Sequence, residues 1–239
     1  MDETMAFWPG GPLFRQSSHA RLGTDTVLLA DFIRPGSRKK GIDLGCGSGA
    51  VMLLLLQRTG KLHMTGLELI ESAANTAQRN LDDNGLTGRG AVICGDLREH
   101  RRLFPGGSFD LAAANPPYFP VSSGALSPEA QRAQARSELS CTLEQLCDCA
   151  AYLLQTGGSF SLVYRPERLS ELFVCLSSRG LEPKRLRFVC PEAASAPSLA
   201  LVEARRGGKC GLTVEAPLIL RDPDGTETEE LKRIYHRID

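Results

Sequence analysis

A short stretch near the middle of the chain reads ANPPYF, from Ala114 to Phe119, and ends the hydrophobic run FDLAAA. Proline lacks a backbone N–H and has a fixed φ, so two in succession stop a sheet ladder. An interruption alone needs neither the amide of Asn115 before the prolines nor the ring of Tyr118 after them. This combination predicts a site that holds a flat, polar group at the end of a strand.

A planar amine is a group that this stretch could hold as a methyl acceptor. Its delocalised lone pair makes it a poor nucleophile, and acceptors on both N–H bonds favour a pyramidal nitrogen. The Asn115 oxygen and the Pro116 carbonyl are the predicted acceptors, with Pro117 setting the turn. Tyr118 can stack on the flat face of the methyl acceptor, and such stacking is worth roughly 1–3 kcal/mol for a nucleic-acid base. We expect Asn115, Pro116 and Tyr118 to be catalytic, Asn115 also to contact the cofactor, and Pro117 and Phe119 to contact the substrate.

A glycine-rich segment, DLGCGSGA, lies between a strand pattern and a helix pattern. Glycines allow a tight turn and close approach of a ligand, and free amides at a helix start attract polar or anionic groups. Glu68 ends the next strand, where a carboxylate can accept hydrogen bonds from both hydroxyls of a ribose. The pattern predicts a nucleotide-type cofactor bound by Gly45, Gly47, Gly49 and Glu68.

Two further carboxylates bear on the identity of this cofactor. Gly45, Gly47 and Ala50 also satisfy the G-x-G-x-x-A fingerprint of dehydrogenases, so the loop alone does not identify the cofactor. Asp43, directly before the loop, favours S-adenosylmethionine, because its carboxylate can order the loop amides and face an ammonium group. Asp96 can accept a hydrogen bond from an adenine amino group, although its position also suits a turn or helix cap.

Composition excludes several classes of protein. The chain has 239 residues, 42% hydrophobic and 23% charged, with 28 acidic and 28 basic residues, as in ordinary globular proteins. A dedicated nucleic-acid domain is usually basic, so such a partner would be met by local patches. The eight cysteines are scattered, which indicates reduced core thiols rather than a metal site. Without a signal peptide or a membrane-spanning run, we expect a cytoplasmic protein.

Strand and helix patterns alternate from about residue 37 onward. This alternation builds a parallel sheet with helices on both faces. The last two strands are joined by a loop too short for a crossover, so they should be antiparallel. The predicted fold is a doubly wound, mostly parallel seven-stranded α/β sheet with a C-terminal antiparallel hairpin. The predicted strands are KKGIDL, KLHMTGLEL, GAVICGD, FDLAAAN, GSFSLVYR, RLRFVCP and LALVEARR, and the helices span residues 50–58, 71–85, 139–155 and 166–179.

Three parts are expected along the chain. Residues 1–35 precede the sheet, include a helix at Thr26–Phe32, and contribute to the cofactor and substrate site. Residues 36–211 form the sheet domain. Residues 212–239 add a short strand and a helix capped by Thr228, packed on the same domain.

These motifs together resemble a known family. DLGCGSG, Glu68, Asp96, NPPY and the final hairpin are similar to class I methyltransferases that act on adenine or guanine amino groups or on glutamine amides. LFRQSSHARLGTDTVLLADF, ARSELSCTLEQL and the ending PLILRDPDGTETEELKRIY resemble the bacterial family that methylates the exocyclic amino group of the adenosine beside the anticodon in valine tRNA. The resemblance covers most of the chain and implies S-adenosylmethionine as cofactor and tRNA as substrate.

The same resemblance implies further site residues. Thr24 and Asp25 would border the methionine end of the cofactor, and Arg136 and Glu138 the substrate mouth. Ser137 departs from the family, whose members often have histidine there. Residues 119–137 are expected to form a lid ordered by substrate.

Basic residues that follow strand ends, or that lie in the N-terminal segment, are the candidates for RNA contacts. The runs RPGSRKK, PKRLR and ARRGGK should lie at the amino edge of the sheet, away from the site. An anticodon-loop base is already single-stranded, so moving it into a pocket requires little energy. The candidates are Arg15, His19, Arg21, Arg132, Arg136 and Arg165.

Other interpretations stay open at this point. A ribosomal RNA guanine amine or a protein glutamine amide offers the same two N–H bonds on a planar nitrogen. A dehydrogenase would use the glycine loop for NADH. A non-catalytic cofactor- or RNA-binding module would have no use for both Asn115 and Tyr118. The tRNA species, the modified nucleotide and the oligomeric state are also left open.

Overall fold

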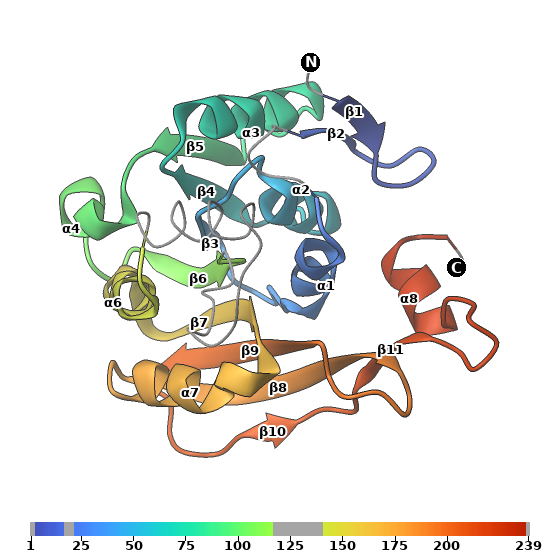
Figure 1. The fold of residues 1–239 in the computed structure, drawn as a ribbon. Helices are drawn as coiled ribbons and strands as arrows, with labels where there is room; N and C mark the ends of the chain where they lie inside the picture. Colours follow the sequence, from blue (N-terminus) through green and yellow to red (C-terminus); the bar gives the residue numbers. More distant parts are fainter. Residues whose placement is uncertain (1–2, 17–21, 117–140, 238–239) are drawn as a thin grey trace, which may run out of the picture.

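The computed structural model describes residues 3–16, 22–116 and 141–237. Within this part, the centre is a nine-stranded sheet in the order β10-β8-β9-β7-β6-β3-β4-β5, with β11 as a second partner of β8 (Figure 1). The seven predicted strands are all present. They are β3 (Lys40–Leu44), β4 (His63–Glu68), β5 (Gly90–Cys94), β6 (Phe109–Ala114), β7 (Leu154–Tyr164), β8 (Leu181–Glu192) and β9 (Leu199–Arg206).

The C-terminal hairpin is antiparallel, as predicted. β9 lies between β7 and β8 and runs antiparallel to both. The sequence predicted one short strand after residue 212, and the structure has two, β10 (Thr213–Val214) and β11 (Leu218–Arg221), which both pair in parallel with β8. They extend the predicted seven strands to nine. The basic run PKRLR lies inside β8 rather than before it, because this strand already begins at Leu181.

Helices cover both faces of the sheet (Figure 1). α1, α2 and α3 contribute to one buried cluster, and α6 and α7 to the other. Alternate residues of one strand enter different clusters, as the period of a strand requires: Leu111 and Ala113 of β6 lie in the first, and Ala112 and Ala114 in the second. The helices are α1 (Thr24–Phe32), α2 (Ala50–Arg58), α3 (Glu71–Asp83), α4 (His100–Leu103), α6 (Leu143–Leu153), α7 (Leu169–Ser177) and α8 (Glu229–Ile234), with 3-10 turns η1 (Leu97–Glu99) and η2 (Pro166–Arg168).

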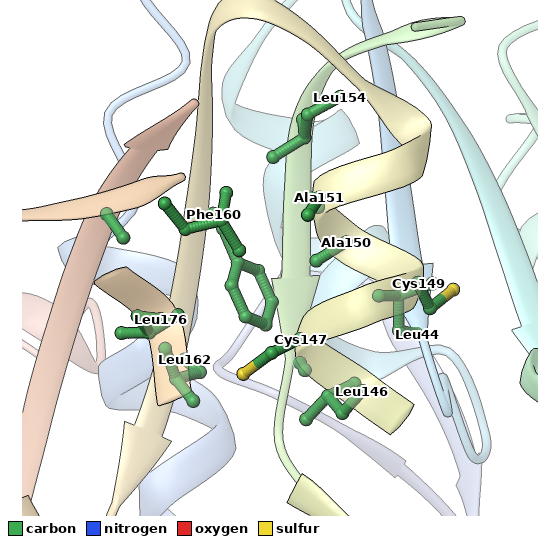
Figure 2. Close-up of a cluster of buried hydrophobic side chains, with 14 of the residues drawn as sticks. Leu44, Leu146, Cys147, Cys149, Ala150, Ala151, Leu154, Phe160, Leu162 and Leu176 are labelled. Atoms are coloured by element: carbon green, nitrogen blue, oxygen red, sulfur yellow. The ribbon is translucent and has the colours of Figure 1, made fainter. Parts of the chain in front are cut away.

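Helix α6 illustrates how local chemistry sets these boundaries. Thr142 and Gln145 form a reciprocal capping box that starts the helix. The helix ends at Leu153, earlier than predicted, because Leu154 adopts an extended conformation and begins β7. Figure 2 shows Cys147 of this helix close to Phe160 and Leu162 of β7. The eight cysteines are free thiols and six of them are buried.

An N-terminal hairpin, which the sequence did not predict, packs on α3. β1 (Glu3–Ala6) and β2 (Leu13–Gln16) pair antiparallel. Asn84, directly after α3, accepts a hydrogen bond from the Leu13 N–H at 2.9 Å and donates to its carbonyl at 2.7 Å. Phe14 is buried in the same cluster as Leu231 of α8. At the start of α8, Thr228 accepts from the Leu231 N–H at 3.3 Å, which confirms the predicted cap.

The strand order reverses at β3, which lies between β4 and β6. In an open α/β sheet, ligands bind outside the carboxyl ends of the strands at such a reversal. The glycine loop follows β3 and Asn115 follows β6. The fold therefore brings both predicted motifs to one edge of the sheet.

Candidate active site

The glycine loop is tied to the end of the neighbouring strand β4. The N–H groups of Gly45 and Cys46 donate to the Leu67 carbonyl at 2.8 and 3.2 Å. Gly45, Gly47 and Gly49 have φ values of 73°, 56° and 80°, a region that favours glycine. A Cβ on Gly45 would meet no atom within 4 Å, so this glycine borders open space at the edge of the sheet. The loop thus has room for a ligand on the side that Gly45 faces.

Glu68 fixes the loop from the end of β4. Its Oε2 accepts from the Gly47 N–H at 2.9 Å, and its Oε1 accepts from the Ile70 N–H at 2.9 Å. The side chain belongs to the buried polar residues, at 8% exposure. Each carboxylate oxygen can accept more than one hydrogen bond, so acceptor capacity remains for ribose hydroxyls. The predicted ribose role of Glu68 stays a prediction.

Asp43 is a buried carboxylate beneath the same loop. It is 1% exposed, and its Oδ2 has no hydrogen-bond partner among the described residues. Burial, and secondarily the negative charge of Glu68, raise the pKa of Asp43 to about 7. An isolated buried carboxylate is unfavourable, so a cationic group placed beside it would remove this penalty. This fits the predicted ammonium group of S-adenosylmethionine.

Asp96 lies after β5 and is engaged by its neighbour. Its Oδ1 accepts from the Arg98 backbone N–H at 2.8 Å, which caps η1. The Arg98 guanidinium contacts both carboxylate oxygens and is the main reason that the pKa of Asp96 is lowered. The capping alternative weighed from the sequence is therefore present, and the adenine contact stays a prediction.

Asn115 lies directly after β6 and is half-buried, and Pro116 is buried. The Nδ2 of Asn115 donates a hydrogen bond to the hydroxyl of Thr26, in α1, at 2.9 Å. No hydrogen bond to its Oδ1 comes from the described residues. The amide oxygen is thus available as an acceptor in this part of the structure, as the predicted amine contact requires.

The N-terminus of α1 brings the other predicted cofactor residues to this edge. Thr24 is exposed and Asp25 is half-buried at the first turn. Asp25 Oδ1 accepts from the Thr26 N–H at 2.8 Å. Because Thr26 contacts Asn115, Asp25 lies close to the acceptor side of the site, and its predicted cofactor role stays a prediction.

Two predicted substrate residues are described and lie in different places. Arg165 follows β7 at the same edge as Asn115 and pairs with Glu167 at 3.0 Å. Arg15 instead pairs with Asp83 at 2.8 Å, at the C-terminal end of α3. Among the described residues, no hydrogen bond or ion pair joins Arg15 to Asn115.

The remaining predicted residues lie outside the described part of the chain. For them the structure adds nothing to the sequence, and their roles stay predictions, as does the lid at residues 119–137. They are Arg21, Pro117, Tyr118, Phe119, Arg136 and Glu138, together with His19 and Arg132.

The sequence interpretation missed two polar side chains. Thr26 lies 89 positions from Asn115, and no local pattern signals that contact. Asn80 of α3 is 1% exposed and donates to the Ser48 carbonyl of the glycine loop at 2.8 Å. It also bonds the backbone N–H and carbonyl of Arg15, at 2.8 and 3.0 Å. An asparagine within an amphipathic helix pattern was the available signal for this link.

Two other kinds of feature are absent from the described residues. None of their helices is long and apolar enough to cross a membrane. Among the same residues, no group of three or more His, Cys, Asp and Glu side chains could hold a metal ion.

The chain is similar to known methyltransferases. The model of the methyltransferase small domain family matches residues 16–171. A protein of Dickeya chrysanthemi (strain Ech1591) named tRNA1(Val) (adenine(37)-N6)-methyltransferase is 33% identical over 92% of this chain and 90% of its own.

Two solved structures share the fold. One is a predicted O-methyltransferase of Agrobacterium tumefaciens, with a TM-score of 0.71, 24% identity, and coverage of 89% of this chain and 96% of its own. The other is geranyl diphosphate C-methyltransferase of Streptomyces coelicolor A3(2) in complex with Mg²⁺, geranyl diphosphate and S-adenosyl-L-homocysteine. Its TM-score is 0.56 at 15% identity, covering 76% of this chain and 79% of its own.

These findings confirm the predicted class I methyltransferase fold and set aside the dehydrogenase interpretation. They also confirm the predicted resemblance to the bacterial adenine-N6-methyltransferases. The chain belongs to the methyltransferase small domain family, and it is a methyltransferase enzyme.

Proposed function

We propose that this enzyme transfers a methyl group from S-adenosylmethionine to the exocyclic amino group of an adenine in tRNA, at the anticodon-loop adenosine beside the anticodon. The observation that carries the proposal is Asn115 at the end of β6. Its Nδ2 is held by Thr26, and its Oδ1 has no partner among the described residues. The name of the Dickeya chrysanthemi relative supports the choice of adenine and tRNA.

The residues of the glycine loop fit the proposed cofactor. Asp43 would bind the ammonium group through its buried Oδ2, which has no hydrogen-bond partner among the described residues. Gly45 borders open space. Glu68 keeps acceptor capacity for the ribose, and Gly47 and Gly49 shape the loop around it. When bound, S-adenosylmethionine supplies an electrophilic methyl group on a positively charged sulfur. Thr24, Asp25 and Asp96 would complete the contacts to it.

The acceptor residues would prepare the amine for attack. Asn115 Oδ1 and the Pro116 carbonyl accept hydrogen bonds from its two N–H bonds and favour a pyramidal nitrogen. Tyr118 would stack on the adenine ring. The amine nitrogen would bond to the methyl carbon as the methyl–sulfur bond breaks, S-adenosylhomocysteine would leave with that electron pair, and one amine proton would pass to water. No strong base is needed, because the methylated nitrogen is cationic and acidic, and the residues act mainly by positioning.

Substrate contacts around this site are proposed on the same basis. Arg165 follows β7 at the same edge of the sheet as Asn115, and we propose that it contacts a tRNA phosphate. Pro117, Phe119, Arg136, Glu138 and Arg21 are proposed to surround the base. Since tRNA is the substrate, we also propose a cytoplasmic location. The division into residues 1–35, 36–211 and 212–239 is proposed as parts of one folded unit, because Phe14, Val51 and Leu231 share one buried cluster.

Nucleoside mass spectrometry tests the proposed function. Purified protein is incubated with S-adenosylmethionine and unmodified tRNA, and the digested nucleosides are compared with a reaction of Asn115→Ala. The proposal expects N6-methyladenosine with the wild-type protein only. Methylation of guanosine, or of a release-factor glutamine offered in parallel, with no methylated adenosine, would overturn the assigned substrate.

A further inference from the structure

One contact at the active edge is not explained by cofactor or substrate binding. Thr26, in the first turn of α1, accepts a hydrogen bond from Asn115 Nδ2 at 2.9 Å. The two residues are 89 positions apart, and α1 and β6 are not adjacent in sequence. The hydroxyl of Thr26 is thus the group that the described structure places against the predicted acceptor residue.

The direction of this hydrogen bond matters, because an amide has two different ends. Asn115 can accept an N–H from an amine only through Oδ1, since Nδ2 is purely a donor. A hydroxyl can donate or accept, so Thr26 alone could hold either end of the amide. A second group is needed to decide which end faces Thr26.

Asp25 is that second group. Its Oδ1 lies 3.4 Å from the Thr26 hydroxyl oxygen and 2.8 Å from the Thr26 N–H. A carboxylate oxygen accepts hydrogen bonds, and in this contact the Thr26 hydroxyl donates its hydrogen to Asp25. The Thr26 oxygen then offers lone pairs to Asn115, which must present Nδ2. The Asn115 Oδ1 is left to face the other way.

Helix α1, which carries Asp25 and Thr26, is anchored in the core at both ends. Val27, Leu28 and Leu29 follow Thr26 and are buried. At the other end of the helix, Arg58 donates to the carbonyls of Ala30 and Ile33 at 2.8 and 2.6 Å. The hydroxyl of Thr26 is therefore held by the core rather than by a surface loop.

The guanidinium of Arg185 adds a second anchor from the sheet. It lies 4.1 Å from the centre of the Phe32 ring at the end of α1. Its Nη1 also pairs with Glu203 of β9 at 2.8 Å. Arg58 of α2 and Arg185 of β8 thus both contact α1, the helix whose first turn carries Asp25 and Thr26.

We propose that Thr26 is a positioning residue for methyl transfer: oriented by Asp25, it binds Asn115 Nδ2 and so directs Asn115 Oδ1 toward the amine of the substrate. The proposal rests on the proposed function, because it assumes that Asn115 accepts from an amine. It assigns a distinct role to the Asp25–Thr26 pair, namely setting the polarity of the acceptor amide. It also predicts that a residue without a hydroxyl at position 26 leaves the amide free to rotate.

Steady-state kinetics of three variants tests the positioning role. Thr26→Val keeps the shape but removes the hydroxyl, Thr26→Ser retains it, and Thr76→Val is a matched control. Thr76 is buried in α3 and donates to the Ser72 carbonyl of its own helix at 2.9 Å. Misplaced reacting groups can lower rates by about 100-fold, so Thr26→Val is expected to lower kcat about 10–100-fold with cofactor KM within about twofold. Thr26→Ser and Thr76→Val are expected to keep kcat within about threefold.

A spectroscopic measurement separates this proposal from the proposed function. The side-chain NH₂ signal of Asn115, assigned by its loss in Asn115→Ala, is followed by ¹⁵N-edited NMR. In Thr26→Val, the Asn115 signal is expected to shift and its protons to exchange faster with solvent. In Thr26→Ser and Thr76→Val, the position of the signal and its exchange rate are expected to stay as in the wild type.

The outcomes of the two experiments are distinct. A wild-type protein without activity on tRNA would overturn the proposed function, and the NMR comparison would then decide the role of Thr26 alone. An unchanged Asn115 signal in Thr26→Val would overturn the positioning role. So would a kcat of Thr26→Val equal to that of the wild type, or a loss in Thr26→Ser as large as in Thr26→Val.

Discussion

The two halves of the active edge are organised in different ways. On the cofactor side, the glycine loop after β3 is held by Leu67 and Glu68 of the adjacent strand β4. On the acceptor side, Asn115 after β6 is held by Thr26, from a helix that precedes the whole sheet. The first half is built between neighbouring strands, and the second depends on a contact across the fold.

This difference separates two kinds of control over the reaction. A change within the loop network should alter how tightly the cofactor binds. A change at the acceptor side should alter the rate of transfer once both ligands are bound. Variants on each side can therefore be tested against the same pair of measurements, cofactor affinity and kcat.

The largest effect is expected for Asn115→Ala, which removes an acceptor of the amine hydrogens. Loss of one preorganised hydrogen-bonding group in an active site lowers kcat by about 10²–10³-fold. Cofactor affinity, measured by calorimetry, should stay within several-fold of the wild type. If cofactor binding is lost as well, Asn115 is a structural residue and the two halves are not separable.

Glu68→Ala should give the opposite pattern. Its carboxylate accepts from the Gly47 and Ile70 N–H groups, and hydrogen bonds to charged groups are worth about 1.5–3 kcal/mol. We expect the Kd of S-adenosylmethionine to rise about 10–100-fold, with a smaller change in kcat at saturating cofactor. A purely kcat effect with unchanged Kd would contradict the assignment of Glu68 to the cofactor side.

Asp43 should make cofactor binding depend on pH. Its pKa is raised to about 7, by burial first and by Glu68 second. Only the ionised form attracts an ammonium group, so affinity should rise with pH up to about pH 7 and fall about tenfold per pH unit below it. Calorimetric titrations between pH 5.5 and 7.5 measure this slope, and Asp43→Asn should flatten it.

The raised pKa of Asp43 also makes the stability of the ligand-free protein depend on pH. The folded-state pKa of Asp43 lies above its ordinary value of 3.8, so the folded protein binds this proton more tightly than the unfolded chain. Its contribution to stability therefore falls as pH rises from about 4 to about 7. Asp43→Asn should raise the Tm relative to the wild type at pH 8 more than at pH 5. An equal difference at both pH values would contradict the raised pKa.

A smaller effect is expected where the N-terminal hairpin meets the cofactor side. Asn80 and Asn84 each bond the N–H and the carbonyl of one residue of β2. Only Asn80 also donates to the Ser48 carbonyl in the glycine loop. One such bond is worth about 1 kcal/mol, so Asn80→Ala should weaken cofactor binding about fivefold. Asn84→Ala is the matched control, and equal affinities of both variants would show that Asn80 does not support the loop.

The sequence predicted the elements whose signals are local. The glycine loop lies between a strand and a helix in one continuous segment, and α2 spans residues 50–58 as predicted. The antiparallel hairpin followed from a short loop between β8 and β9. The end of α6 was misplaced, because Leu153 and Leu154 are both apolar and apolar residues suit a buried helix as well as a buried strand.

Contacts between distant segments were beyond local patterns. Nothing in the residues around Thr26 indicates that its hydroxyl meets Asn115, because that distance is set by the packing of α1 on the sheet. Only one short strand was predicted where β10 and β11 both form, because each is too short to show a period of its own. The pairing of Asp96 with Arg98 was foreseen only as a general capping alternative.

A crystal structure with S-adenosyl-L-homocysteine and an anticodon-loop oligonucleotide tests the central claim most directly. It should show Asn115 Oδ1 about 3 Å from the adenine amino nitrogen, with Nδ2 still on the Thr26 hydroxyl. An adenine amine bound by other groups, with the Asn115 amide turned away from it, would contradict the account.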